Sequence, residues 1–268
     1  MHESKLQHAS WQELLASPAA APHVVQICDS DAFMVSGVAF FAAEGLRRGE
    51  AVVLTGTQAH LRGVREALAG AGTDPDAALR RGQLTLNDAQ QSVATVLVDG
   101  RLDEDRFDAL AGEGLAKARA DARFTGVRWW GEMSNLLHQH GNAQDALRAE
   151  ELADRITRQH GVRLFCSYLL DRFDPAGYGG MLLEVCCRHS HVIPAEDYVR
   201  HRLAVNRAIS EVIGEIRGPL LQSLLSWKGL GCDLPSSQAL LFWVREALPE
   251  RFADVLSRAK AHQVEEPA

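Results

Sequence analysis

The sequence predicts an α/β fold in which a mostly parallel sheet is flanked by helices and followed by an all-helical C-terminal extension. Two observations predict it. Up to residue 173, short apolar runs alternate with segments of helical periodicity, which is the pattern of repeated strand–helix–strand units. After residue 173 only helical patterns follow. The chain has 268 residues, of which 46% are hydrophobic, and this composition is sufficient for a buried core.

Five strands are expected, at residues 23–28, 51–55, 84–86, 126–130 and 162–168. The run AVVLT at 51–55 is almost entirely apolar, as expected for a strand with both faces covered. Because helical segments separate the strands, the connections are crossovers and the strands run mostly parallel.

Helices between the strands are expected at residues 31–48, 58–69, 93–98, 103–119, 135–140 and 143–160. Asp29 or Ser30 suits the N-cap of the first, because short polar side chains accept hydrogen bonds from the free amide groups there. Gly70 and Gly72 end the second. The segment 93–98 is expected to be helical despite its β-branched residues.

The turn-rich sequence DPAGYGG marks a change in organisation. Helices are expected beyond it at residues 181–188, 196–217, 220–227, 236–248 and 249–260. The chain therefore divides into a leader at 1–21, an α/β domain at 22–173, a helical region at 174–262 and a tail at 263–268. The apolar residues of the helical region either pack on the α/β domain or form a dimerisation or partner surface, and we expect a homodimer.

The net charge of −7, with both signs mixed along the chain, disfavours direct binding to nucleic acid. The N-terminal residues lack the apolar run of a secretory signal, and no stretch approaches the roughly 20 apolar residues that cross a bilayer. We therefore expect a cytoplasmic protein that does not contact a membrane. Its five cysteines, including the adjacent Cys186 and Cys187, are expected to be thiols rather than a disulfide framework.

Ligands of an open parallel sheet bind beyond the carboxyl ends of its strands. The segment after the first expected strand, CDSDAFMVS at 28–36, lies at that edge. A phosphate-cradling loop needs glycines, a lysine for the phosphates and a serine or threonine for magnesium. This segment has no glycine and no lysine, and it carries Asp29 and Asp31 where a phosphate would lie. The sequence thus argues against hydrolysis of a nucleoside triphosphate, but it leaves open nucleotide binding of another kind.

Several short segments follow one another in a specific order between residues 23 and 173. They are HVVQIC at 23–28, FFAAEGLRRGE at 40–50 running into AVVLT, GQLTL at 82–86, RWWGEM at 128–133, Glu150, FCSY at 165–168 and Phe173. In this order they resemble the MEDS domain, a methanogen/methylotroph sensory domain of the dichloromethane-repressor type. The resemblance covers a little over half of the chain. Part of it, GLRRGE at 45–50 with GQL at 82–84, is also similar to the RecA-like clock ATPases of the KaiC type.

The resemblance implies a P-loop NTPase or RecA-like fold without the Walker A motif. The clock ATPases carry catalytic acidic residues just after a strand, where this chain reads TQAH at 57–60. The family therefore implies a scaffold whose former nucleotide cleft became a sensory pocket. Such domains are proposed to sense small, often hydrocarbon-derived molecules and to act on histidine kinases or transcription regulators.

The segment Arg128 to Met133 is the first candidate for the ligand site. Strand alternation places Arg128 and Trp130 on one side and Trp129 on the other, with Glu132 just past the strand end. An aromatic wall with one charge of each sign suits an amphipathic ligand. The alternative is a structural ion pair between Arg128 and Glu132 with both tryptophans in the core.

Five further residues complete the predicted ligand site, and all lie in or near the expected strands: His23, Cys28, Asp31, Thr55 and Tyr168. Tyr168 shares a strand face with Cys166, which is expected to pack inside. Redox or electrophile sensing by a thiol is a further alternative, although it requires an exposed, electropositive setting.

The run Cys186, Cys187, His189 and His191 carries four potential zinc ligands. Its spacing argues against a metal, because adjacent cysteines point apart on a helix. We expect no metal, no cofactor and no catalytic residue.

The sequence thus predicts a non-enzymatic sensory protein that binds a small ligand in a degenerate nucleotide cleft. It would signal to a sensor kinase, response regulator or transcription factor of a two-component or related system. Two alternatives stay open: a nucleotide-binding or weakly hydrolytic relative of the clock ATPases, and an interaction module without a ligand.

Overall fold

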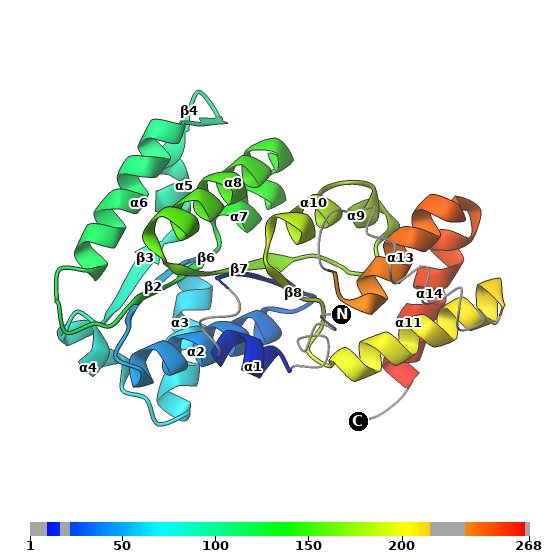
Figure 1. The fold of residues 1–268 in the computed structure, drawn as a ribbon, viewed down its shortest axis with the longest axis horizontal. Coiled ribbons are helices and arrows are strands. Elements are labelled where there is room, and N and C mark those ends of the chain that lie inside the picture. Colours follow the sequence, from blue (N-terminus) through cyan, green and yellow to red (C-terminus); the bar gives the residue numbers. More distant parts are fainter. Residues whose placement is uncertain (1–9, 17–21, 215–233, 266–268) are drawn as a thin grey trace, which may run out of the picture.

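The computed structural model describes residues 10–16, 22–214 and 234–265. At its centre is a six-stranded sheet in the order β3-β2-β6-β7-β1-β8, and every neighbouring pair is parallel (Figure 1). The strands are β1 (His23–Cys28), β2 (Ala51–Gly56), β3 (Leu84–Asp88), β6 (Val127–Gly131), β7 (Arg163–Leu169) and β8 (His191–Ile193). The predicted α/β class is confirmed.

Helices cover both faces of the sheet (Figure 1). One face packs against α1 (Trp11–Ala16), α2 (Asp31–Arg47), α3 (Gln58–Gly70) and α4 (Pro75–Arg80). The opposite face packs against α5 (Ala89–Val96), α6 (Glu104–Ala118), α7 (Met133–Gln139) and α8 (Ala143–His160). We call these the α2 face and the α8 face.

Strand alternation distributes the side chains of β6 as predicted. Trp130 packs into the core of the α2 face, whereas Trp129 packs on the α8 face. Arg128 lies on the side of Trp130, where it bonds the backbone of α1 and α2. On β7 the same alternation puts Cys166 and Tyr168 together on the α8 face.

Several local features differ from the sequence prediction, and among them the short helices at Pro75–Arg80 and Pro175–Gly179 were not predicted. The strand β8 was not predicted, because it has only three residues, and it extends the sheet past residue 173 by pairing with β1. The predicted helix 93–98 is wrong in its last turn, where Leu97–Val98 pairs with Arg101–Leu102 as the hairpin β4–β5. Asp99 and Gly100 both have positive φ, as a two-residue hairpin turn requires.

The C-terminal helices pack on the α/β part. They are α9 (Pro175–Gly179), α10 (Met181–Arg188), α11 (Tyr198–Ile213), α13 (Ser236–Ala247) and α14 (Pro249–Glu265). Their apolar side chains join those of α8 in one core, in which the Tyr178 ring lies 5.0 Å from Phe242 and 5.1 Å from Phe252. The predicted helix at 220–227 falls outside the described residues. The homodimer stays a prediction.

Candidate functional site

A cluster of four buried polar side chains lies on the α8 face. It consists of His23 at the start of β1, Glu150 on α8, Cys166 on β7 and His189 just after α10. Glu150 Oε2 lies 3.5 Å from His23 Nε2, 3.3 Å from His189 Nε2 and 3.4 Å from Cys166 Sγ. Cys166 Sγ also lies 3.5 Å from His23 Nε2. We call these four side chains the donor cluster.

Local structure brings the donor cluster together. His23 pairs with Leu164 in the parallel register of β1 and β7, so it shares a sheet face with Cys166 two residues on. Ser190 bonds the backbone of His23 in both directions, which holds the neighbouring His189 beside it with the ring centroids 4.0 Å apart. Glu150 lies on the buried stripe of α8, next to Ala146 and Ala149.

A further ring of contacts fixes the orientation of these side chains. Tyr168 donates its hydroxyl to Glu150 Oε1 at 2.6 Å. His189 Nδ1 lies 2.7 Å from the carbonyl oxygen of Val185, and His23 Nδ1 lies 3.6 Å from Asp154 Oδ1. Burial alone would lower the pKa of His23, but the carboxylates of Asp154 and Glu150 outweigh it and raise that pKa. Burial opposes ionisation of Glu150, yet the two imidazoles hold its pKa well below the usual value.

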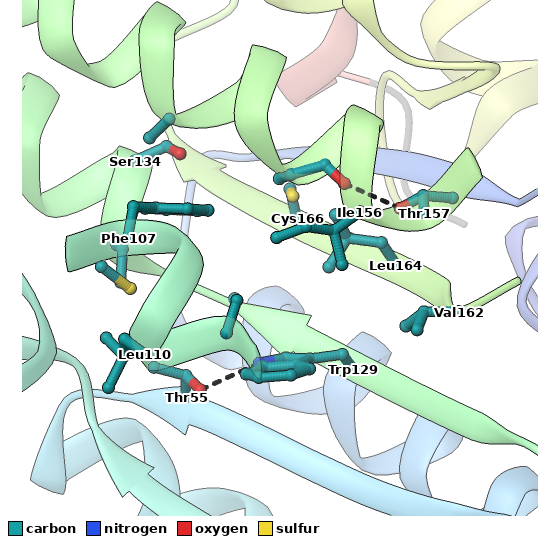
Figure 2. Close-up of a pocket in the computed structure, with 15 residues that line it drawn as sticks. Thr55, Phe107, Leu110, Trp129, Ser134, Ile156, Thr157, Val162, Leu164 and Cys166 are labelled. Carbon is teal, nitrogen blue, oxygen red and sulfur yellow. Dashed lines mark hydrogen bonds between the residues drawn. The ribbon is translucent and has the colours of Figure 1, made fainter. Parts of the chain in front are cut away.

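An apolar pocket adjoins the donor cluster between the sheet and helices α6 and α8 (Figure 2). Its volume is about 80 Å³. In Figure 2 Trp129 lies below the pocket and Phe107 and Leu110 lie to its left, while Ile156 lies above Trp129. At roughly 10–15 Å³ for each water-sized group, the pocket takes a molecule of about six non-hydrogen atoms.

Two residues of the pocket wall link it to other parts of the site. Thr55 lines it and accepts a hydrogen bond from Trp129 Nε1 at 3.0 Å, which holds the indole against the sheet. Cys166 lines it as well and belongs to the donor cluster. A Cβ atom on Gly114 would lie 2.5 Å from Trp129, so the glycine on α6 provides the space for that ring.

The carboxyl edge of the strands, where the ligand was predicted, is held by internal hydrogen bonds. Glu132 is buried, and its Oε2 accepts from the backbone amide of Thr57 at 2.9 Å. Its Oε1 lies 2.8 Å from His60 Nδ1, and His60 Nε2 lies 3.3 Å from the exposed Asp31. Glu132 therefore anchors the turn between β2 and α3.

The charge state of His60 depends on this network, which gives a pH prediction. The hydrogen bond to Glu132 raises the pKa of His60, and burial only partly opposes it. A raised pKa adds stability at pH values below about 6.5, the unfolded value, and this stability is lost as pH rises through the folded-state pKa. The stability lost on His60→Gln substitution should thus be larger at about pH 6 than at about pH 8, as measured by urea unfolding. A loss that does not change across this range would contradict the assignment.

Arg128 and Trp130 lie on the α2 face, away from the apolar pocket. Arg128 is fully buried and forms an ion pair with Glu50, not with Glu132, and its guanidinium also donates to the carbonyl oxygen of Leu15 at 2.7 Å. Trp130 is fully buried and donates to Ser167 Oγ at 3.0 Å. Arg128 and Trp130 therefore do not line the apolar pocket.

The other predicted residues are divided among four places. His23 belongs to the donor cluster, to which Tyr168 is hydrogen-bonded through Glu150, Thr55 lines the pocket, and Asp31 lies at the carboxyl edge. Cys28 is buried on the α2 face, where burial raises the pKa of its thiol well above the usual value.

The cysteines offer no exposed thiol among the described residues. Cys28, Cys166 and Cys186 are free and buried. Burial raises the pKa of Cys166 well above the usual value and that of Cys186 to about 12, so neither has the thiolate character that redox sensing requires. Cys187 is disulfide-bonded, and the expectation of five thiols is wrong there.

The run Cys186, Cys187, His189 and His191 is not gathered around one point. Cys186 packs in the core of the α8 face, and His191 Nδ1 lies 3.2 Å from Ser190 Oγ. Only His189 reaches the donor cluster. Sequence reasoning missed Glu150 as a site residue, although a glutamate among the alanines of a buried helix stripe is a signal of a buried polar partner.

Comparison with known proteins identifies the family. The sequence model of the MEDS family, described as "MEthanogen/methylotroph, DcmR Sensory domain", matches residues 22–190, which is more than half of the chain. No curated protein and no solved structure matches. None of the described helices has the length and apolar character needed to cross a membrane. The chain therefore belongs to the MEDS family of sensory domains.

Proposed function

We propose that this chain is a non-enzymatic sensor that binds a small apolar molecule in the pocket beside Trp129. The observation that carries this proposal is the lining of the pocket. Apart from Thr55, Ser134, Thr157 and the Cys166 thiol, all its residues are apolar or glycine. Such a lining suits a hydrocarbon or a simple hydrocarbon derivative, because the binding energy comes from removing apolar surface from water.

The position of α8 supports a route for the signal. One side of this helix lines the pocket through Ala149, Ala153 and Ile156. Other residues of α8 pack in the same core as α10, α13 and α14. A ligand that prefers one placement of α8 would therefore bias the C-terminal helices, since a population shift requires only a difference in affinity. We propose a histidine kinase or a transcription regulator as the recipient.

Filling the pocket should abolish binding. Purified chain is heated with 1-propanol, 1-bromopropane or toluene, and the melting temperature is compared with that of Ile156→Trp. The wild type should melt at a higher temperature with at least one of them, because a ligand at 100 times its Kd adds about 2.7 kcal/mol. Ile156→Trp should lose this rise, while Val199→Trp on the exposed face of α11 should keep it.

Two outcomes would contradict the pocket assignment. One is a rise that persists unchanged in Ile156→Trp. The other is the absence of a rise with every compound, together with a rise on adding ATP, which would favour a nucleotide-binding relative instead.

A further inference from the structure

Four atoms that ligate metals converge in the donor cluster: His23 Nε2, Glu150 Oε2, Cys166 Sγ and His189 Nε2. All lie within 4.8 Å of one another, and all four side chains are buried. Within residues 10–16, 22–214 and 234–265, no other group of three or more such residues meets this spacing. We propose that the donor cluster binds one divalent transition-metal ion of the zinc type.

The spacing of the atoms fits a tetrahedral ion. Bonds of about 2.0–2.1 Å to nitrogen or oxygen and about 2.3 Å to sulfur place neighbouring ligand atoms roughly 3.3–3.7 Å apart. Four of the six separations among these atoms are 3.3, 3.4, 3.5 and 3.5 Å, and the other two are within 4.8 Å. An ion therefore fits between the four atoms with little movement of the backbone.

Two imidazole nitrogens of the cluster histidines lack a hydrogen-bond partner, His23 Nδ1 and His189 Nε2, and the second of them faces Glu150. His189 Nδ1 lies 2.7 Å from the carbonyl oxygen of Val185, and a carbonyl only accepts, so Nδ1 carries the proton. In the neutral ring Nε2 then presents a lone pair toward Glu150 Oε2, 3.3 Å away. This Nε2 atom is buried, and no described residue gives it a hydrogen bond. Two electron-rich atoms facing each other in the core favour a cation between them.

The contacts behind the donor atoms are those that support metal ligands. A ligating histidine usually donates its second ring nitrogen to a carbonyl or carboxylate, and ligating carboxylates are themselves hydrogen-bonded. His189 has the carbonyl of Val185 and Glu150 has the hydroxyl of Tyr168, whereas the carboxylate of Asp154 lies 3.6 Å from His23 Nδ1, at ion-pair rather than hydrogen-bond distance. All three contacts leave the cluster-facing atom available.

The kinds of donor indicate the class of metal. Two imidazoles, one carboxylate and one thiol are an N₂OS set, which suits zinc and its first-row neighbours but not the oxygen-binding calcium or magnesium. Binding would release the thiol proton of Cys166 to solvent and form a metal–thiolate bond. Four protein ligands close the coordination sphere, which is the arrangement of a structural site rather than a catalytic one.

An ion here would tie together β1, α8, β7 and the segment after α10, so it would fix α8 against the sheet beside the pocket. This proposal does not rest on the proposed ligand, because metal binding and ligand binding are measured separately.

Cobalt tests the site, because a Co²⁺–thiolate bond gives a near-ultraviolet charge-transfer band and tetrahedral Co²⁺ gives visible bands. Untagged full-length chain is stripped with a chelator and titrated with Co²⁺. We expect one ion per chain with both sets of bands, and their loss on adding Zn²⁺. Cys166→Ala should remove the charge-transfer band. Cys28→Ala, which removes a buried thiol on the opposite face of the sheet, should leave it intact.

A second variant keeps all four ligands, and it tests the site even if Cys166→Ala does not fold. Tyr168→Phe removes only the hydroxyl that holds Glu150, and it should weaken Co²⁺ binding about 10–100-fold. The proposal is overturned if the stripped wild type gives no cobalt bands, or if the charge-transfer band persists in Cys166→Ala. Equal affinity for Co²⁺ in Tyr168→Phe and in the wild type would also contradict the proposed metal site.

Discussion

Replacing Glu50 by alanine is expected to lower the free energy of unfolding by about 3–5 kcal/mol, as is usual when one partner of a buried ion pair is removed. Glu50 is buried and pairs with Arg128, which is fully buried on the α2 face, and with Arg163. Burial lowers the pKa of Arg128 to about 10, which shows that the charged guanidinium is disfavoured there, and the carboxylate of Glu50 offsets part of that cost. The substitution leaves a positive charge in the core without its partner.

Urea unfolding of the purified variant measures this loss. The matched control is Glu44→Ala, which breaks the exposed ion pairs of Glu44 with Arg47 and Arg48 on α2. Surface pairs contribute about 0–1 kcal/mol, so the control should change little. If Glu50→Ala and Glu44→Ala lost similar amounts of unfolding free energy, the ion pair of Glu50 with Arg128 would not stabilise the core as proposed.

Trp130→Ala is expected to cost about 3–5 kcal/mol, because it removes the largest fully buried side chain among the described residues. The indole packs so closely on β2 that a Cβ atom on Gly56 would lie 2.3 Å from it, and it donates a hydrogen bond to Ser167. Trp129 is only half-buried and borders the pocket. Trp129→Ala should therefore cost less stability but lose the ligand-induced rise in melting temperature.

The two tryptophans thus provide an internal comparison. Unfolding free energy and ligand-induced melting shift are measured for both variants. We expect the larger loss of unfolding free energy for Trp130→Ala and the larger loss of ligand binding for Trp129→Ala. The opposite order would contradict the placement of the ligand on the α8 face.

The fold was largely predictable from the sequence, because its strands and helices follow strong local patterns. The helices α8 and α10 begin and end at the predicted residues. The strand β8 escaped prediction, because three residues carry too little periodicity. The hairpin β4–β5 was also missed, although the Asp99–Gly100 pair is a hairpin signal.

The candidate site was harder to predict, since it depends on which distant elements meet. Alternation on β6 correctly separated Trp129 from Trp130 but did not show which of them faces an open space. Gly114 on α6 makes room for the Trp129 ring itself, whereas the open space beside that ring is lined by side chains of α6, α7 and α8 that are distant in the sequence. His189 was noticed only within a metal-like run of its own neighbours, whereas its partners are His23 and Glu150, contributed by β1 and α8.

The position of a bound heavy atom shows whether the ligand binds on the α8 face beside Trp129. A crystal of the full chain soaked in 1-bromopropane gives an anomalous signal from bromine. We predict a bromine peak between Trp129 and Ile156, inside the apolar pocket. A peak at the carboxyl edge beside Thr57 and Glu132, or no peak in the pocket at saturating concentration, would contradict the account.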